Sequence, residues 1–257
     1  MEKKIVFFDI DGTLLDSNKS LQESTKYAIH ELQQKGVYTA IATGRTPTMF
    51  EPIREELNIE SYVSINGQYV VFEGAEIYTN EIETMQLDKL VTDAELRGHE
   101  MAFYNHEYVY ATAQNHPYIE DSFQSFHMNY PPHNRNFYKE NPVYQGLLFC
   151  KETDEGYYEK SFPNFEFVRW HNLALDVLPK GSSKAKGIQQ FINRAGFKRE
   201  NTFAFGDGRN DMQMISYVGT GIVMGNAVDE LKQCADIVTN SCDDDGIWNG
   251  LKAVGLL

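Results

Sequence analysis

Carboxylate side chains follow directly on the first apolar run of this chain. The run KIVFFDI, residues 4–10, leads into the motif D-I-D-G-T at residues 9–13. Short continuous runs rich in β-branched and aromatic residues are typical of strands buried on both faces, as in parallel sheets. Ligands of open α/β sheets bind beyond the carboxyl ends of the strands. Asp9 and Asp11 are therefore placed for chemistry on a ligand.

Three further polar motifs occupy equivalent places. T-G-R at residues 43–45 and G-D-G-R-N-D at residues 206–211 each follow an apolar run, and P-K-G-S-S-K at residues 179–184 leads into a predicted helix. A single D-x-D-G-T sequence is equally typical of a turn with an aspartate cap. Four such motifs at the ends of successive elements favour one shared ligand site over four unrelated turns.

Hydrophobic periodicity predicts the elements that carry these motifs. Near the N-terminus, strands over 4–10, 37–42 and 62–65 alternate with helices over 22–35, closed by Gly36, and over 47–57. The same rhythm returns with a helix over 183–195, a strand over 202–205, a helix after Asp211, a strand over 221–224 and another near Ile237. This alternation predicts an α/β fold with a doubly wound, Rossmann-like parallel sheet.

The middle of the chain differs in composition from both ends. Residues 81–178 carry 7 Lys/Arg against 16 Asp/Glu, six of the seven histidines and 18 of the 33 aromatic residues. Their pattern predicts a helix over 87–98, an aromatic-rich segment over 101–110, a loop over 129–141, and strands over 143–150 and 165–170. We therefore expect a core formed by residues 1–80 and 179–257, split by an inserted α+β domain at 81–178.

As a set, the four motifs resemble those of the haloacid dehalogenase-like (HAD) superfamily, specifically the Cof-type phosphatases with a type IIB cap. The resemblance spans nearly the full chain, and M-G-N-A at residues 224–227 extends it. Ala185 and Gln68 depart from the family pattern, but neither replaces a charged group. The resemblance implies hydrolysis of a small phosphorylated metabolite, such as a sugar phosphate, with the insertion as a cap that closes over the site and selects the substrate.

The implied chemistry calls for a divalent cation. A carboxylate about 4 Å from a phosphate monoester meets a repulsion of about 4 kcal/mol at an effective dielectric constant near 20. Oxygen ligands with retained waters favour Mg²⁺. By resemblance, Asp9 and Asp207 supply carboxylate oxygens and Asp11 its backbone carbonyl, while Asp211 supports the metal site from close by or from outside the ligand shell.

The resemblance also assigns catalytic roles. Asp9 attacks phosphorus and forms an aspartyl-phosphate, and Asp11 serves as general acid and then general base. For Arg45, a contact with substrate and an ion pair with a core carboxylate are equally open. The side chains and backbone groups expected to bind the phosphate are Thr43, Gly44, Arg45, Lys184 and Asn210.

Three weaker signals have ordinary structural explanations. The insertion's histidines lack metal-binding spacing, so we expect them in the core or at the surface: His99, His106, His116, His127, His133 and His171. Its aromatic side chains are expected to form its core, although some could line the cleft: Phe103, Tyr104, Tyr108, Tyr110, Phe123, Phe126, Tyr130 and Trp170. The run at 243–245 (Asp-Asp-Asp) is expected to favour the dipole of a terminal helix rather than to bind metal.

Composition limits the partners. A net charge of −14 argues against nucleic acid, and no run reaches the roughly 18 apolar residues of a membrane span. Three cysteines (Cys150, Cys234, Cys242) without C-x-x-C spacing argue against a disulfide framework or a zinc site. We expect a cytoplasmic enzyme whose partner is a small phosphate ester. The oligomeric state has no sequence signal.

Two alternative functions fit the same motifs. The first is a phosphotransferase or phosphomutase on the same fold, which would pass the phosphoryl group to a hydroxyl instead of water. The second is a binding module that retains the fold without catalysis.

Overall fold

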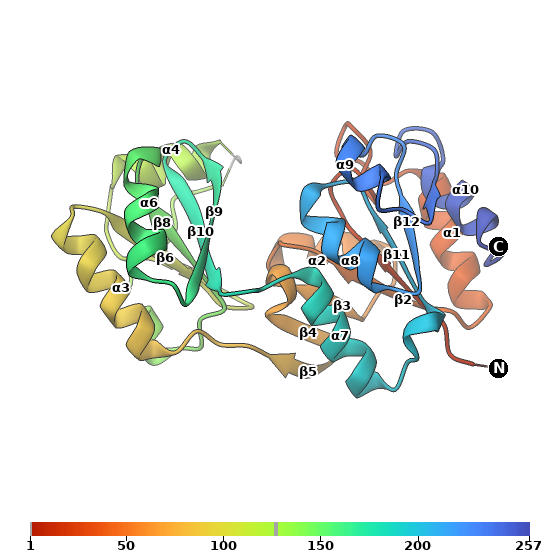
Figure 1. Ribbon diagram of the computed structural model, residues 1–257, viewed down its shortest axis with the longest axis horizontal. Helices are drawn as coiled ribbons and strands as arrows, with labels where there is room; N and C mark the ends of the chain where they lie inside the picture. Colours follow the sequence, from red (N-terminus) through yellow and green to blue (C-terminus); the bar gives the residue numbers. More distant parts are fainter. Residues whose placement is uncertain (1, 126–127) are drawn as a thin grey trace. The chain divides into compact units, whose positions relative to one another are not determined.

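The computed structural model describes residues 2–125 and 128–257, which form two compact units (Figure 1). Unit 1 comprises Met1–Thr79 and Ser183–Leu257, and unit 2 comprises Asn80–Ser182. The chain thus leaves unit 1 after residue 79 and returns at residue 183, within a few residues of the expected borders at 80 and 179. Phe126 and His127, named above among the aromatic and histidine side chains, lie outside the described residues.

Unit 1 is built on one eight-stranded sheet with the order β13-β12-β11-β1-β2-β3-β4-β5. The six strands from β13 to β3 run parallel, whereas β4 and β5 continue the sheet antiparallel. The strand bounds are β1 (Ile5–Phe8), β2 (Tyr38–Ala42), β3 (Tyr62–Ser64), β4 (Tyr69–Phe72), β5 (Ala75–Thr79), β11 (Thr202–Gly206), β12 (Thr220–Val223) and β13 (Ile237–Val238).

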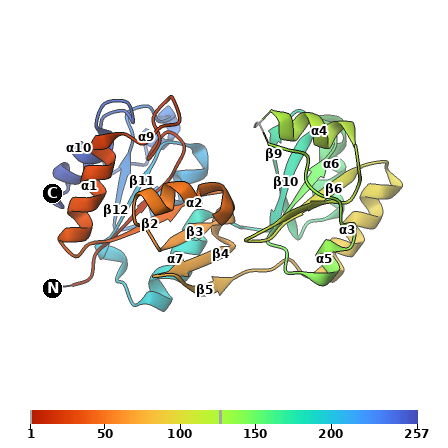
Figure 2. The same cartoon turned by 180° about the vertical axis from the view of Figure 1, so that it is seen from behind.

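Helices cover both faces of this sheet, which confirms the predicted doubly wound α/β fold. Alternate residues of β1 point to opposite faces, because strand side chains alternate. Val6 and Phe8 belong to one apolar core, and Ile5 and Phe7 to the other. The first face carries α1 (Glu23–Gln34), α2 (Pro47–Glu56) and α10 (Gly246–Ala253), and the second carries α7 (Lys184–Ala195), α8 (Met212–Tyr217) and α9 (Asp229–Lys232). Figure 1 shows α7 and α8 in front of the sheet. Figure 2 gives the view from the opposite side, with α1 and α2 in front of the sheet.

Unit 2 has its own antiparallel sheet with the order β7-β6-β8-β10-β9. The cores on its two faces are separate, one against α3, α5 and α6 and the other against α4. The bounds are α3 (Thr84–Leu96), β6 (Glu100–Tyr104), β7 (Val109–Ala111), α4 (Pro117–Gln124), α5 (Phe137–Glu140), β8 (Gln145–Phe149), α6 (Glu152–Ser161), β9 (Phe165–His171) and β10 (Ala174–Pro179).

Cys150, Cys234 and Cys242 all have free thiols. Within the two described ranges, none of the helices combines the length and the apolar character that a membrane crossing requires.

Candidate active site

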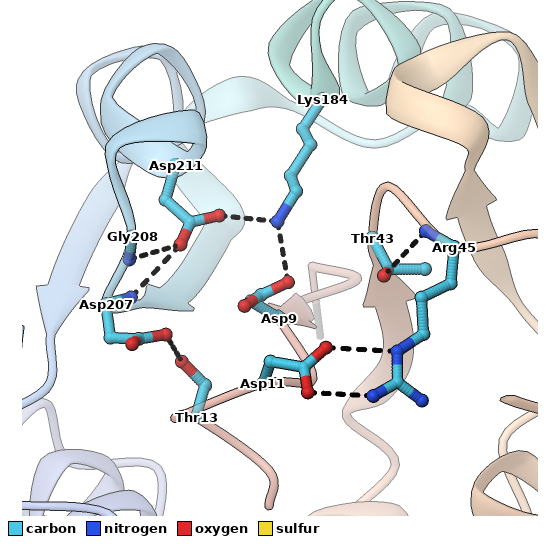
Figure 3. A network of polar contacts seen from close by, with 9 residues as sticks. All are labelled: Asp9, Asp11, Thr13, Thr43, Arg45, Lys184, Asp207, Gly208 and Asp211. Carbon is cyan, nitrogen blue, oxygen red and sulfur yellow. Dashed lines mark hydrogen bonds and ion pairs between the residues drawn. The ribbon is translucent and has the colours of Figure 1, made fainter. Parts of the chain in front are cut away.

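The polar motifs of unit 1 meet at one edge of the sheet. β1 lies between β2 and β11 and runs parallel to both, so the carboxyl ends of the three strands are neighbours. Asp9 follows β1, Thr43 follows β2, and Asp207 follows β11. The backbone N–H of Asp9 donates to the carbonyl of Phe205 at 3.0 Å, which extends the β1–β11 pairing to the carboxylate itself. Figure 3 shows the resulting network.

A buried lysine connects two of the carboxylates. Lys184 Nζ donates to Asp9 Oδ1 at 2.6 Å and to Asp211 Oδ1 at 2.7 Å (Figure 3). The side chains of Lys184 and Asp211 are 0% exposed, and that of Asp9 is 10% exposed. Lys184 is the first residue of α7, and the Ser183 hydroxyl accepts from the N–H of Lys186 at 3.2 Å as the helix cap. The cap and the helix start together fix where the ammonium lies.

Burial and charge oppose each other at this lysine. Burial on its own would lower the pKa of Lys184, but the charges of Asp211 and Asp9 outweigh it and raise that pKa. Burial raises the pKa of Asp9, and the nearby Asp211 charge adds to this, whereas Lys184 acts in the opposite direction. The site therefore holds more negative charge than one ammonium can offset, a condition that favours binding of a further cation.

Three carboxylates form a cluster that could hold that cation. Asp9, Asp207 and Asp211 each offer an oxygen, and the three oxygens lie within 4.8 Å of one another. An all-oxygen donor set of this kind suits Mg²⁺. Burial raises the pKa of Asp207 to about 6, even though Thr13 Oγ1 donates to its Oδ1 at 3.0 Å. The chemistry of the donors and their spacing thus fit the expected metal.

Both oxygens of Asp211 accept hydrogen bonds within the site. Oδ1 accepts from Lys184, and Oδ2 accepts from the backbone N–H groups of Asp207 and Gly208, each at 3.0 Å. These bonds fold the 206–211 loop around the Asp211 carboxylate. Asp211 thus supports the loop, and whether it also lies in the ligand shell of the metal stays a prediction.

Gly12 allows the first motif to approach the third. Its φ of +76° lies in the left-handed region, and a Cβ there would fall 2.3 Å from Asp207 Oδ2. A side chain would meet both backbone strain and a clash with a candidate metal ligand. The glycine of D-I-D-G-T is therefore required by the packing of Asp207.

The Asp11 carboxylate points away from the metal cluster and pairs with two cations. Arg45 donates to it through Nε at 3.0 Å and through a terminal nitrogen at 2.7 Å, and Lys19 Nζ lies 2.9 Å from Oδ1. Arg45 thus forms an ion pair with a carboxylate, one of its two expected roles. Burial would raise the pKa of Asp11, but the bonds from Arg45 and Lys19 outweigh it and lower that pKa.

The remaining expected phosphate-binding groups lie around the same edge. Thr43 is buried, and its Oγ1 accepts from the N–H of Arg45 at 3.1 Å. A Cβ on Gly44 would lie 3.1 Å from the Asn66 side chain, so the T-G-R turn packs against the turn that follows β3. Asn210 is exposed on the 206–211 loop. Its binding to the phosphate stays a prediction.

Sequence reasoning assigned no role to three residues that belong to this network. Thr13 bonds to Asp207, and Lys19 pairs with Asp11. Asn226 Nδ2 donates to the carbonyl of Gly12 at 2.8 Å, and its Oδ1 accepts from the N–H of Cys242 at 2.9 Å. Asn226 lies in the M-G-N-A motif, and the family resemblance of that motif could have identified it as a site residue. Lys19 lies in a polar loop that contains no such motif.

The weaker sequence signals fall outside the site. Among the described residues, the carboxylate cluster is the metal-compatible group, and it contains no histidine. Phe103 and Phe123 are core residues of unit 2, whereas Tyr108 is 54% exposed and does not belong to a core. In the 243–245 run, Asp243 Oδ1 accepts from the N–H of Ser17 at 2.9 Å, and Asp245 makes no side-chain cap to α10. That run thus anchors a loop as well as preceding a helix.

A family model described as haloacid dehalogenase-like hydrolase matches residues 6–251. The chain belongs to this HAD family. "Putative phosphatase YkrA" of Bacillus subtilis (strain 168) is 46% identical over 257 residues, which are 100% of both chains. A solved protein from Geobacillus kaustophilus HTA426 is 48% identical with a TM-score of 0.96, over 99% of this chain and 100% of that one.

A third relative lies in the expected subclass. The HAD subclass IIB sugar phosphatase BT4131 is 31% identical with a TM-score of 0.82, over 99% of this chain and 100% of that one. The resemblance to HAD phosphatases predicted from the four motifs is thereby confirmed. The chain is an enzyme of the HAD family, a hydrolase of its phosphatase group.

Proposed function

We propose that this enzyme is a Mg²⁺-dependent phosphatase that hydrolyses a small phosphorylated metabolite through an aspartyl-phosphate on Asp9. The observation that carries the proposal is the Asp9 carboxylate at the end of β1, bonded to buried Lys184 and clustered with Asp207 and Asp211. A nucleophile, a cation for the phosphoryl oxygens and a metal-compatible cluster are thus present at one edge of one sheet.

Asp9 and Asp207 are the side chains that would hold the metal, with the Asp11 carbonyl as a further expected ligand. When bound, Mg²⁺ would supply positive charge that offsets the repulsion between the Asp9 carboxylate and the anionic phosphate. Asp211 would keep its role of holding the loop that presents Asp207. Lys184, already within 2.6 Å of Asp9 Oδ1, would contact the transferring phosphoryl group.

The first step forms one bond and breaks another. A carboxylate oxygen of Asp9 attacks phosphorus in line, and the bond between phosphorus and the leaving alcohol oxygen breaks. Asp11 delivers a proton to that oxygen, so the alcohol departs neutral. Lys184, the Thr43 hydroxyl, the Gly44 N–H and Asn210 would bind the phosphoryl oxygens while charge spreads over them.

The second step returns the enzyme to its starting state. Asp11 takes a proton from water, the water oxygen attacks phosphorus, and the bond to Asp9 breaks to release phosphate. The ion pair with Arg45 lowers the pKa of Asp11, which favours the carboxylate form that this step needs and disfavours the protonated form that the first step needs. We infer that Arg45 acts on the reaction through Asp11, and its contact with substrate stays a prediction.

Unit 2 would select the substrate as a cap. Unit 1 supplies the groups described above for a phosphate and a metal, which are common to all phosphate esters. Three of the four motifs lie wholly in unit 1, unit 2 contains only the start of the fourth, at residues 179–182, and one solved relative is a subclass IIB sugar phosphatase. We therefore assign recognition of the leaving alcohol to unit 2 and propose a sugar phosphate or a related metabolite as substrate.

Phosphate release from a metabolite panel, with Mg²⁺ and with a chelator, tests this function. We expect turnover only with the metal, and a loss of about 10³-fold or more in kcat for Asp9→Asn, because the variant lacks the nucleophile. Circular dichroism and thermal unfolding of the variant serve as the folding control. Undiminished turnover by a folded Asp9→Asn enzyme would exclude Asp9 as the nucleophile. Transfer to an acceptor alcohol instead of phosphate release would indicate a phosphotransferase.

A further inference from the structure

The turn between β3 and β4 has an unusual backbone. Ile65, Asn66 and Gly67 follow one another with positive φ angles of 50°, 51° and 91°. Glycine adopts this left-handed region readily and asparagine adopts it more often than most residues, but a β-branched residue such as Ile65 is strained there. Strained backbone persists only where the surrounding structure holds it, and it clusters at active sites and ligand-binding sites. The strain at Ile65 therefore points to a function of the turn.

The neighbouring T-G-R turn holds this conformation in place. The N–H of Ile65 donates to the carbonyl of Arg45 at 3.1 Å, and the N–H of Asn66 donates to the carbonyl of Thr43 at 3.2 Å. The residues on both sides of Gly44 are thus bonded to the strained turn. These two bonds fix the position of Asn66 relative to Gly44, whose own N–H is expected to bind the phosphate.

The side-chain amide of Asn66 lies against Gly44. A Cβ on Gly44 would fall 3.1 Å from Asn66 Oδ1 and 3.3 Å from Asn66 Nδ2. Asn66 is half-buried, and its backbone carbonyl accepts from Gln68 Nε2 at 3.3 Å. Within residues 2–125 and 128–257, no group forms a hydrogen bond with the Asn66 amide itself. An amide that is held in place without a partner can bond to a ligand at this position.

The two ends of the amide differ in what they can bind. Nδ2 carries two hydrogens to donate, whereas Oδ1 only accepts. The oxygens of an ionised phosphoryl group accept hydrogen bonds, so Nδ2 is the end that fits them. Hydrogen bonds with one ionised partner are about twice as strong as those between neutral groups. A single donor at this position would therefore contribute measurably to phosphate binding.

We propose that Asn66 binds a phosphoryl oxygen of the substrate through Nδ2, beside the N–H of Gly44. The inference rests on the proposed phosphatase function and adds a catalytic residue to it. All of the groups concerned belong to unit 1. The strained turn fixes the donor before the substrate arrives, so the contact needs no rearrangement while charge spreads over the phosphoryl oxygens.

Isothermal titration calorimetry of the full-length enzyme with inorganic phosphate, in the presence of Mg²⁺, measures this contact directly. Asn66→Gly keeps the left-handed backbone and removes the amide. Asn66→Leu keeps the approximate size and shape of the side chain but has no donor. We expect both substitutions to weaken phosphate binding by about 10-fold or more, because each removes a hydrogen bond to a charged group. The value of kcat/KM for the best metabolite should fall by a similar factor.

Asn58→Gly and Asn58→Leu are the matched controls. Asn58 is also left-handed, with a φ of 50°, but it is exposed and precedes β3, whereas Asn66 follows that strand. A leucine at either position carries similar backbone strain, so the two leucine variants differ in what the lost amide contacts. Both control substitutions should leave phosphate binding and kcat/KM unchanged. Asn66→Gly introduces no backbone strain, and it decides the test if Asn66→Leu fails to fold.

The order of the variants identifies the role of the amide. Similar weakening of phosphate binding by Asn66→Gly and Asn66→Leu supports the donor. Weakening by Asn66→Gly alone would mean that the side chain acts by packing on Gly44, and it would overturn the proposal. Wild-type phosphate binding in Asn66→Gly would mean that only the backbone conformation matters, and it would overturn the proposal as well.

Turnover of the wild-type enzyme separates this inference from the proposed function. An enzyme that releases phosphate from a metabolite, and whose Asn66 variants bind phosphate as tightly as wild type, overturns the Asn66 contact and leaves the phosphatase intact. An enzyme that binds inorganic phosphate through Asn66 but hydrolyses no metabolite overturns the phosphatase function and leaves the contact. An enzyme that neither binds nor releases phosphate overturns both.

Discussion

At the scale of single residues, the site depends on one ammonium between two carboxylates. Lys184 is 1% exposed and bonds to Asp9 and Asp211 at 2.6 and 2.7 Å. In such a buried network the interaction energies of the charges are large, and the loss of one member leaves the others uncompensated. Lys184 therefore contributes to stability as well as to the proposed chemistry.

Lys184→Met should be strongly destabilising for this reason. We expect a loss of about 3–5 kcal/mol in the free energy of unfolding, measured by urea denaturation without metal. Lys186→Met is the control on the same helix, since Lys186 is exposed, and its effect should stay within about 0.5 kcal/mol. Equal effects of the two substitutions would contradict a structural role for the Lys184 ion pairs.

Some of these residue contacts could be predicted from the sequence and others could not. Asp9, Lys184, Asp207 and Asp211 come together because their motifs end or begin regular elements at one sheet edge, a consequence of parallel topology. The partner of Arg45 could not be decided, because an arginine reaches either a substrate or a carboxylate from the same backbone position. Lys19 belongs to a loop whose course depends on tertiary bonds such as Ser17 to Asp243.

At the scale of elements, the turn after β3 positions α7. Gly67 has a φ of +91°, and a Cβ there would lie 2.3 Å from the carbonyl oxygen of Ser183, the cap of α7. The turn thus packs directly on the residue that precedes Lys184. An Asn-Gly pair such as Asn66-Gly67 is typical of a turn, but it does not predict this contact, which joins segments more than a hundred residues apart.

Gly67→Ala should therefore affect both stability and catalysis. Gly74→Ala is the matched control, because Gly74 also has a positive φ, +77°, but its nearest neighbour would be 3.9 Å from the new Cβ. We expect about 1 kcal/mol of destabilisation for Gly74→Ala from backbone strain alone, and about 3 kcal/mol for Gly67→Ala from strain and overpacking. Only Gly67→Ala should lower kcat. Indistinguishable urea midpoints for the two variants would argue against the contact with α7.

The elements of unit 2 were predicted less completely than those of unit 1. The helix α6, with the sequence ETDEGYYEKS, buries only Tyr158 and therefore lacks the apolar periodicity that identifies a helix. β10 follows β9 after a two-residue turn without a glycine, so the two strands have no boundary in the sequence. In unit 1, by contrast, buried parallel strands are continuous apolar runs, and the helices between them end at residues such as Gly36 and Gly196.

The buried carboxyl of β10 should make the stability of the protein depend on pH. Burial raises the pKa of Asp176 in the folded state to about 7, well above the ordinary value of 3.8 for an aspartate. The folded state therefore binds this proton more tightly than the unfolded state, and stability falls as pH rises from about 4 to about 7. Asp176→Asn removes that titration, so its free energy of unfolding relative to wild type should increase across this range and level off above it.

Urea denaturation of wild type and Asp176→Asn at pH 5, 6, 7 and 8 measures this difference, with other titrating groups common to both proteins. A difference that is constant with pH would mean that Asp176 titrates normally.

At the scale of the whole molecule, acidity should restrict the charge of the substrate. The net charge is −14, and residues 81–178 contribute 7 basic against 16 acidic side chains. Such a field repels anions that approach from solution, and the repulsion grows with the charge of the anion. A substrate with two phosphates is therefore repelled more strongly than a substrate with one.

The ratio of kcat/KM for fructose 1,6-bisphosphate to that for fructose 1-phosphate measures this repulsion. At low ionic strength the bisphosphate should be the poorer substrate, and the ratio should rise a few-fold as salt is added, because the Debye length shortens to about 8 Å at 0.15 M. Glycerol in place of salt, at matched osmolality, controls for effects other than screening. A ratio that falls with salt would contradict this prediction. It would mean that local positive charge along the path of the substrate, and not the net charge of the molecule, determines the preference between the two substrates.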